Sequence, residues 1–193
     1  MTPMYATKRG SWLILVLMVL CAHAQGQDAL KFSDLEGLEV AAKVFHDQVV
    51  WRDGREAPVK LERDVKVVIG PGDSIHFTVI PTVQGPRGKR QGQTISGPFT
   101  LGQVQETASV GGGSGVWNYA DGALTFVRTF KGGAFRSTIT FARSGGGFSC
   151  TINEGFAREG GAGAISLNSP VDGAPITILS AKQTSSRCTA KKS

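Results

Sequence analysis

The sequence predicts an all-β protein built as an antiparallel up-and-down meander of about eight strands. Its 26 glycines, many of them in pairs, separate short runs that are rich in Val, Ile, Thr and Phe. Within these runs apolar and polar residues alternate, as Ile75, Phe77 and Val79 do with His76 and Thr78, and this alternation is typical of a half-buried strand. Because an open sheet of this size leaves exposed edges, we expect closure into a barrel, with a two-sheet sandwich as the alternative.

The first residues have the pattern of a cleavable signal peptide. Lys8 and Arg9 precede an apolar run from Trp12 to Cys21, and Ala22-His23-Ala24 matches the small-x-small pattern of a cleavage site. The run is shorter than the roughly 20 residues that a membrane-spanning helix needs. We therefore expect a periplasmic or extracellular protein with no integral membrane segment after cleavage. The expected divisions are a signal peptide over 1–24, a flexible N-terminal segment over 25–34 and a single β-barrel domain over 35–190.

Two cysteines remain after cleavage, Cys150 and Cys188. In an oxidising compartment such a pair forms a disulfide by default, and two buried free thiols are the alternative. The formal net charge of +6 falls when the signal peptide is removed, and it is too small to indicate nucleic-acid binding. The surface basic loop of Arg87, Lys89 and Arg90 is interpreted as a solvated tip, with contact to an acidic polysaccharide or to lipid headgroups as the alternative.

Three glycine turns predict the register of the central meander. They are Asp121-Gly122, Gly132-Gly133 and Gly145-Gly146. A two-residue hairpin turn determines which residues face one another on its two strands. The resulting pairs gather apolar side chains on one face, and they place Arg128 opposite Ser137 and Ser137 opposite Glu154. We therefore expect Arg128 and Glu154 to meet above the serine as a charged pair on the buried face.

These residues suggest a cavity that binds a small ligand. The hypothetical ligand-binding residues are Trp117, Tyr119, Phe126, Arg128, Ser137 and Glu154. In this hypothesis Arg128 attracts an anionic group on a small, partly apolar ligand. Two alternatives stay open. Arg128 and Glu154 can form an internal salt bridge that contributes little net stability, and the aromatic side chains can simply be core.

The sequence contains no complete catalytic or metal-binding motif. His46 and His76 are interpreted as ordinary strand residues, and HExxH and CxxC patterns are missing, so the sequence predicts no zinc site and no cofactor. The stretch Gly112 to Val116 lacks the last glycine and the following helix of a nucleophile elbow. The first predicted function is a non-catalytic exported ligand-binding protein. The second is a cell-envelope or protein interaction module with a solid core, and the third is a hydrolase of unrecognised type.

The stretch Val116 to Phe130, followed by Lys131 to Phe135, resembles part of an uncharacterised family of small exported bacterial β proteins. Phe156 to Gly161 and Ser180 to Gln183 match further parts of that pattern. The resemblance covers most of the mature chain and implies export and a β fold, but no activity. More distantly, the meander resembles lipocalin-like and avidin-like barrels, which commonly hold small ligands. Leu35 to Leu38 is similar to their opening Gly-x-Trp motif, although the tryptophan of that motif is absent.

Overall fold

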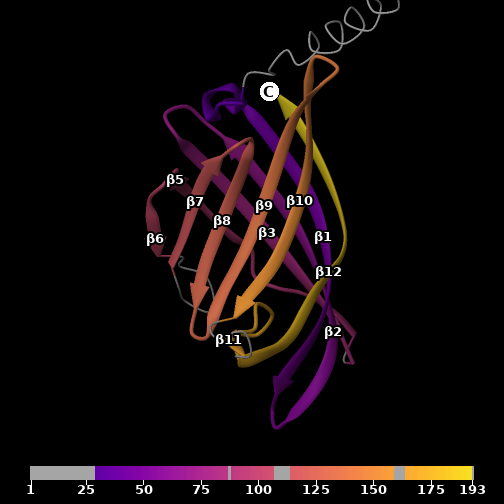
Figure 1. Ribbon diagram of the computed structural model, residues 1–193. Helices are drawn as coiled ribbons and strands as arrows, with labels where there is room; N and C mark the ends of the chain where they lie inside the picture. The colour runs from indigo at the N-terminus through magenta and orange to yellow at the C-terminus, as the bar shows by residue number, and fades with distance from the viewer. Residues whose placement is uncertain (1–28, 87, 107–113, 159–163, 193) are drawn as a thin grey trace, which may run out of the picture.

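The computed structural model describes residues 29–86, 88–106, 114–158 and 164–192. The expected signal peptide, residues 1–24, lies outside the described residues. The described chain is all-β apart from one short 3-10 helix (Figure 1), which confirms the predicted fold class. Its elements are η1 (Phe32–Leu35), β1 (Leu38–Arg52), β2 (Arg55–Ile69), β3 (Ser74–Gly85), β4 (Gly88–Gln91), β5 (Ile95–Thr100), β6 (Val104–Glu106), β7 (Ser114–Ala120), β8 (Ala123–Phe130), β9 (Gly133–Ser144), β10 (Gly147–Arg158), β11 (Ile165–Asn168) and β12 (Pro175–Lys192).

The strands form two antiparallel sheets. The first sheet has the order β11-β12-β1-β2-β3-β4, with β5 also paired to β3, and the second has the order β10-β9-β8-β7-β6. In Figure 1 the orange strands of the second sheet lie across the indigo and magenta strands of the first. The antiparallel meander is therefore confirmed, but the barrel is not closed, since β10 and β12 lie side by side and belong to different sheets.

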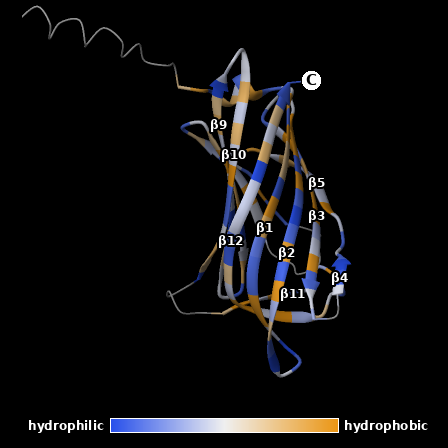
Figure 2. Ribbon diagram, turned by 90° about the vertical axis from the view of Figure 1, so that its right-hand side faces the viewer, coloured by the Kyte–Doolittle hydropathy of each residue, from blue (hydrophilic) through white to orange (hydrophobic). Residues whose placement is uncertain are grey.

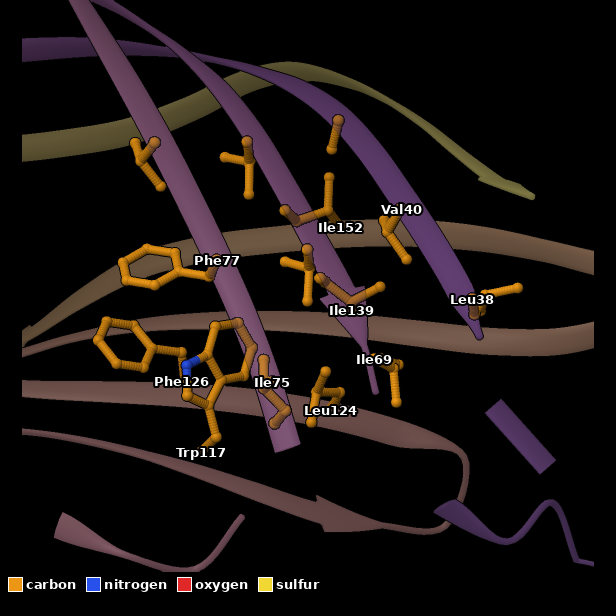
Figure 3. Packing of buried hydrophobic residues seen from close by; sticks show 14 of the residues in the cluster. Leu38, Val40, Ile69, Ile75, Phe77, Trp117, Leu124, Phe126, Ile139 and Ile152 are labelled. Atoms are coloured by element: carbon orange, nitrogen blue, oxygen red, sulfur yellow. The ribbon is translucent and has the colours of Figure 1, made fainter. Parts of the chain in front are cut away.

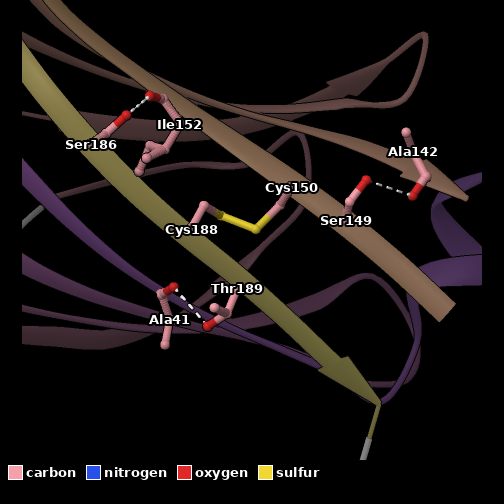
Figure 4. The surroundings of a disulfide bond; sticks show 8 residues. All are labelled: Ala41, Ala142, Ser149, Cys150, Ile152, Ser186, Cys188 and Thr189. Atoms are coloured by element: carbon pink, nitrogen blue, oxygen red, sulfur yellow. Dashed lines mark hydrogen bonds between the residues drawn. A yellow bond between two sulfur atoms is a disulfide. The ribbon is translucent and has the colours of Figure 1, made fainter. Parts of the chain in front are cut away.

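Side chains and a disulfide join β10 to β12 in place of a backbone ladder. The amide oxygen of Gln183 accepts a hydrogen bond from the Glu154 backbone N–H at 2.6 Å, and its amide nitrogen donates to the carbonyl of Ile152 at 3.1 Å. Ser186 donates to the same carbonyl at 3.0 Å (Figure 4). The predicted disulfide between Cys150 and Cys188 is confirmed. These bonds satisfy backbone groups that an unpaired sheet edge would leave exposed.

The register of the central meander is as predicted at two of its three turns. Ser137 faces Glu154 across the third hairpin, and Gly115 faces Arg128 across the first. The second hairpin differs, because Phe130 pairs with Gly133 and the turn is therefore Lys131-Gly132. Arg128 consequently faces Phe135, and the predicted pairing of Arg128 with Ser137 is wrong. Because the shift is by two residues, every side chain keeps its predicted face.

The main core fills the space between the sheets (Figure 3). Strand β1 contributes alternate residues from Leu38 onward, and the apolar and polar segments alternate along this sheet in Figure 2. Phe77 packs edge-on against Trp117, and their ring centroids are 5.9 Å apart. Leu30 and Phe32 also pack against this core. Part of the segment expected to be flexible, residues 25–34, is thus held against the folded domain.

Candidate functional site

A cavity of about 360 Å³ lies between the two sheets, beside the main core. Its walls are contributed by both sheets and by the turn that precedes β12. Much of the cavity lining is apolar and includes Ala57, Leu61, Val83, Phe130, Leu167 and Ile176. These residues are inward-facing members of alternating strands, so the cavity continues the buried face of the sheets.

The deep end of the cavity carries a cluster of polar side chains, which we call the polar cluster. It consists of His46, Arg63, Ser137 and Glu154, which contact one another. The Glu154 carboxylate is fully enclosed, with a side-chain exposure of 0%. Its Oε2 lies 2.6 Å from Nη1 of Arg63 and 2.9 Å from Nε2 of His46, and its Oε1 accepts a hydrogen bond from Ser137 at 3.0 Å. Both carboxylate oxygens are therefore engaged by groups from three different strands.

These contacts determine the charge state of Glu154. Burial acts to raise the pKa of this carboxyl group, but Arg63 and His46 more than offset it and hold the pKa below its ordinary value of 4.5. A carboxylate at this position is consequently ionised at neutral pH. Glu154 is not among the residues that line the cavity, whereas Arg63 and His46 are, so its carboxylate orients these two side chains and does not itself line the space.

Irregularities in β12 accompany the cluster. The pairing of β1 with β12 shifts between Phe45 and His46, so that His46 faces Gln183 and Phe45 faces Ser185. Thr184, the extra residue, donates to the carbonyl of Phe45 at 3.2 Å. Such a bulge bends the strand, and the neighbouring Gln183 reaches the backbone of Glu154 on β10. The bulge therefore joins the histidine strand to the glutamate strand.

Arg128 lines the cavity beside this cluster and is 8% exposed. Its guanidinium carbon lies 4.8 Å from the centre of the Phe130 ring, and the guanidinium of Arg63 is stacked in the same way at 4.5 Å from Phe135. Both cations are thus positioned by aromatic faces. Burial, and after it the positive charge of Arg63, lowers the pKa of Arg128, so the surroundings disfavour its charge.

The β1–β2 turn and β11 lie at the end of the molecule opposite to the C-terminus (Figure 1), and residues from this end line one side of the cavity. Its lining residues there, including Asp53, Arg55 and Arg90, are exposed, whereas those at the deep end are buried. An ion pair crosses this rim, because Nη1 of Arg52 lies 2.8 Å from Asp172. The rim is therefore charged, and the cavity is exposed to solvent at this end.

The structure brings only some of the predicted site residues to the cavity. Phe126 and Arg128 line it. Ser137 and Glu154 lie behind it in the polar cluster. The expected contact of Arg128 with Glu154 is replaced by contacts of Glu154 with Arg63 and His46. Trp117 is 2% exposed and belongs to the core.

Tyr119 does not line the cavity, because it contacts the N-terminal segment instead. Its hydroxyl donates to the carbonyl of Leu30 at 2.5 Å, and its ring packs edge-on against Phe32. Burial, followed by the charges of Asp34 and Asp121, raises the pKa of this phenol. Tyr119 thus anchors the N-terminal segment at the end of the sheets away from the polar cluster.

The sequence analysis did not identify His46, Gln48 and Arg63 as residues of the site. The signal that could have identified them is the two-residue period of the strands. On β1, His46 and Gln48 continue the inward series of Leu38 and its alternate neighbours, and both are buried. On β2, Arg63 precedes the buried series of Val65 and its alternate neighbours. A polar residue at an inward position of a half-buried strand indicates a buried polar contact.

The three residues of the predicted basic loop do not act as one group. Arg87 lies outside the described residues, and Lys89 and Arg90 belong to β4. Lys89 lies 3.1 Å from Glu62 in an exposed ion pair, while Arg90 contributes to the rim of the cavity. In the described part of the chain, His, Cys, Asp and Glu side chains form no group of three that could hold a metal ion.

Comparison with protein-family models, with curated proteins and with solved structures finds no match for this chain. No activity is therefore transferred to it from a relative. Within the described ranges, no helix has the length and apolar composition needed to cross a bilayer.

Proposed function

We propose that this chain is a non-catalytic exported protein that holds a small, partly apolar ligand in the cavity between its sheets. The observation that carries the proposal is the cavity itself. Its volume of about 360 Å³ falls within the range of about 300–1,000 Å³ that is usual for small-molecule sites. Its apolar walls with a few convergent polar groups are also usual for such sites. An interaction module with a solid core would not need this space.

Export is part of the same proposal. The disulfide between Cys150 and Cys188 is compatible with an oxidising compartment. The pattern that ends at Ala24 is that of a cleavable signal peptide, which would direct the chain to export. A carrier or receptor in the periplasm or outside the cell would meet ligands taken up from the surroundings. The ligand we expect has an apolar body and an anionic group, because Arg128 lines the cavity.

Filling the cavity is expected to abolish binding while the fold is kept. Leu61 lines the cavity and is only half-buried, so the larger ring in Leu61→Trp would occupy the empty space. The adjacent Lys60 faces solvent on the same strand, and Lys60→Trp is the matched control. Native mass spectrometry of protein purified from its own periplasm or medium, together with titration of the dye anilinonaphthalene sulfonate, measures occupancy.

We expect the wild type and Lys60→Trp to retain a co-purified molecule and the dye, and Leu61→Trp to lose both. Circular dichroism checks that all three proteins are folded. Equal binding by folded Leu61→Trp and Lys60→Trp would place any ligand elsewhere. A wild type that carries no molecule and binds no apolar probe would contradict the proposed function.

A further inference from the structure

Two polar side chains lie among apolar neighbours on the cavity wall. His46 and Gln48 are inward-facing residues of β1, both line the cavity, and they are 2% and 7% exposed. Across the β1–β2 ladder, His46 faces Leu61 and Gln48 faces Val59. Nδ1 of His46 and Nε2 of Gln48 have no hydrogen-bond partner among the residues that the structure describes. Buried polar groups are normally hydrogen-bonded, because leaving them unsatisfied costs free energy.

The strand on the other side of β1 does not supply the two missing bonds. His46 faces Gln183 of β12 there, and Gln48 faces Ala181, which has an apolar side chain. The amide oxygen and the amide nitrogen of Gln183 are both bonded to backbone groups of β10. A polar atom of a ligand in the cavity would therefore complete what the flanking strands leave incomplete.

The contacts of the imidazole ring determine which hydrogen bond its Nδ1 makes. Nε2 of His46 lies 2.9 Å from Oε2 of Glu154. An ionised carboxylate only accepts hydrogen bonds, so this Nε2 carries a hydrogen. Nη1 of Arg63 lies 2.6 Å from the same oxygen and already matches the negative charge. A second positive charge, on the ring, would be unmatched where the His46 and Glu154 side chains are 1% and 0% exposed. The ring is therefore neutral, and its Nδ1 is an acceptor.

The cavity wall thus offers one acceptor beside one donor, since the amide nitrogen of Gln48 only donates. The two residues are two positions apart on one face of β1, which is about 7 Å at 3.3 Å per residue. An ionised carboxylate or phosphate brings only acceptors to this place, and an ammonium brings only donors. A primary amide brings both, but it adds further polar positions beside Leu61 and Val59. A hydroxyl donates and accepts through a single atom.

We infer that the ligand carries a hydroxyl group, which donates a hydrogen bond to Nδ1 of His46 and accepts one from Nε2 of Gln48. This inference rests on the proposed function, and it adds a neutral polar group to the ligand described there. Leu61 and Val59 line the cavity next to this position, so the carbon atoms that bear the hydroxyl contact apolar side chains. The ligand class is therefore an alcohol or a phenol with an apolar body.

Four probes of equal size test the hydroxyl: heptanol, hexyl methyl ether, heptylamine and octane. Displacement of anilinonaphthalene sulfonate is expected to show heptanol binding roughly tenfold or more tightly than each of the others. The reason is that the ether cannot donate, the ammonium form of the amine cannot accept, and octane can do neither.

A substitution of Gln48 tests the donor separately. Gln48→Met keeps the approximate length of the side chain and removes its amide, so heptanol should bind roughly tenfold more weakly and octane equally well. Gln84→Met is the matched control, because Gln84 is exposed on β3 and does not line the cavity. We expect Gln84→Met to bind all four probes as the wild type does.

The ligand-free proteins supply a second readout. Since Gln48→Met removes a buried donor without a partner, it should raise the midpoint of thermal unfolding, whereas Gln84→Met should leave the midpoint unchanged. Nitrogen NMR of the wild type should show a neutral His46 ring with its hydrogen on Nε2, and the exposed His76 serves as the reference.

Several results would overturn the hydroxyl. They are equal affinities for heptanol and hexyl methyl ether, undiminished heptanol binding by Gln48→Met, and a doubly protonated His46 ring. A thermal midpoint that does not rise in Gln48→Met would mean that a buried water already satisfies the amide, and it would overturn the hydroxyl as well. In each of these cases the binding of octane would leave the proposed function intact. Failure of all four probes to displace the dye would count against both.

Discussion

Replacing Glu154 with alanine is expected to lower the free energy of unfolding by about 3–5 kcal/mol, which is the usual cost of removing one partner from a buried ion pair. The carboxylate is fully enclosed and accepts contacts from Arg63, His46 and Ser137. Its removal leaves a guanidinium and two further polar groups facing an empty space. Chemical denaturation followed by tryptophan fluorescence measures the change.

Glu39 provides the matched control. It also lies on a strand and is paired with a cation, since its carboxylate lies 2.9 Å from Nζ of Lys66, but the two side chains are 44% and 53% exposed. Exposed pairs of this kind contribute about 0–1 kcal/mol, so Glu39→Ala should change stability little. If Glu154→Ala proves as mild as Glu39→Ala, the polar cluster does not hold the two sheets together.

The stability of the wild type is expected to depend on pH through the same carboxyl group. The folded pKa of Glu154 lies below its ordinary value of 4.5, because Arg63 and His46 outweigh the effect of burial. A group of this kind contributes stability that is fully present above its unfolded pKa and is lost as the pH falls through its folded pKa. Unfolding free energies measured from neutral pH downward should therefore fall below about pH 4.5 in the wild type.

Glu154→Gln is the variant that isolates this effect, because it keeps the shape of the side chain and cannot titrate. We expect its stability to be lower than that of the wild type at neutral pH and to show a flatter decline in acid. Parallel pH profiles of the two proteins would assign the acid sensitivity to other carboxyl groups.

The parts of the fold that the sequence predicts are those determined by neighbouring residues. Asp121 and Gly122 both take positive φ, at 49° and 77°, so the turn and the register of its hairpin follow from this dipeptide. The second turn had two candidate glycines. Gly132 takes the positive φ of 88°, and a Cβ on Gly133 would collide with the carbonyl of Ala157 and crowd Ile165. Those contacts come from strands later in the chain, which the local sequence does not reveal.

The same distinction between local and distant contacts applies to the candidate site. The facing of Ser137 and Glu154 was predictable because one tight hairpin connects their strands. The partners of Glu154 were not, because His46 and Arg63 belong to the opposite sheet. Hairpin turns determine register within a sheet but do not determine which residues meet across two sheets. The sequence showed only that both positions fall on the inward-facing side of their strands, because each continues the alternating series of buried residues.

The double variant Cys150→Ser, Cys188→Ser is expected to lose about 4 kcal/mol of unfolding free energy by the loop-entropy relation. The bond closes a separation of 38 residues and joins β12 of one sheet to β10 of the other. Gln183 and Ser186 still bridge the two strands in this variant. We therefore expect a folded but less stable protein, which thermal and chemical denaturation will measure.

Reduction of the wild type supplies the control, because a reductant should lower its stability to that of the double variant and should leave the variant unchanged. A wild type that is equally stable with and without reductant would mean that the side-chain bonds of Gln183 and Ser186 suffice to hold β10 against β12. The two outcomes also bear on the cavity, since β10 carries both Cys150 and Glu154. If the disulfide holds this strand in place, its loss should weaken binding of the dye anilinonaphthalene sulfonate as well as stability, because the carboxylate that orients Arg63 and His46 moves with the strand.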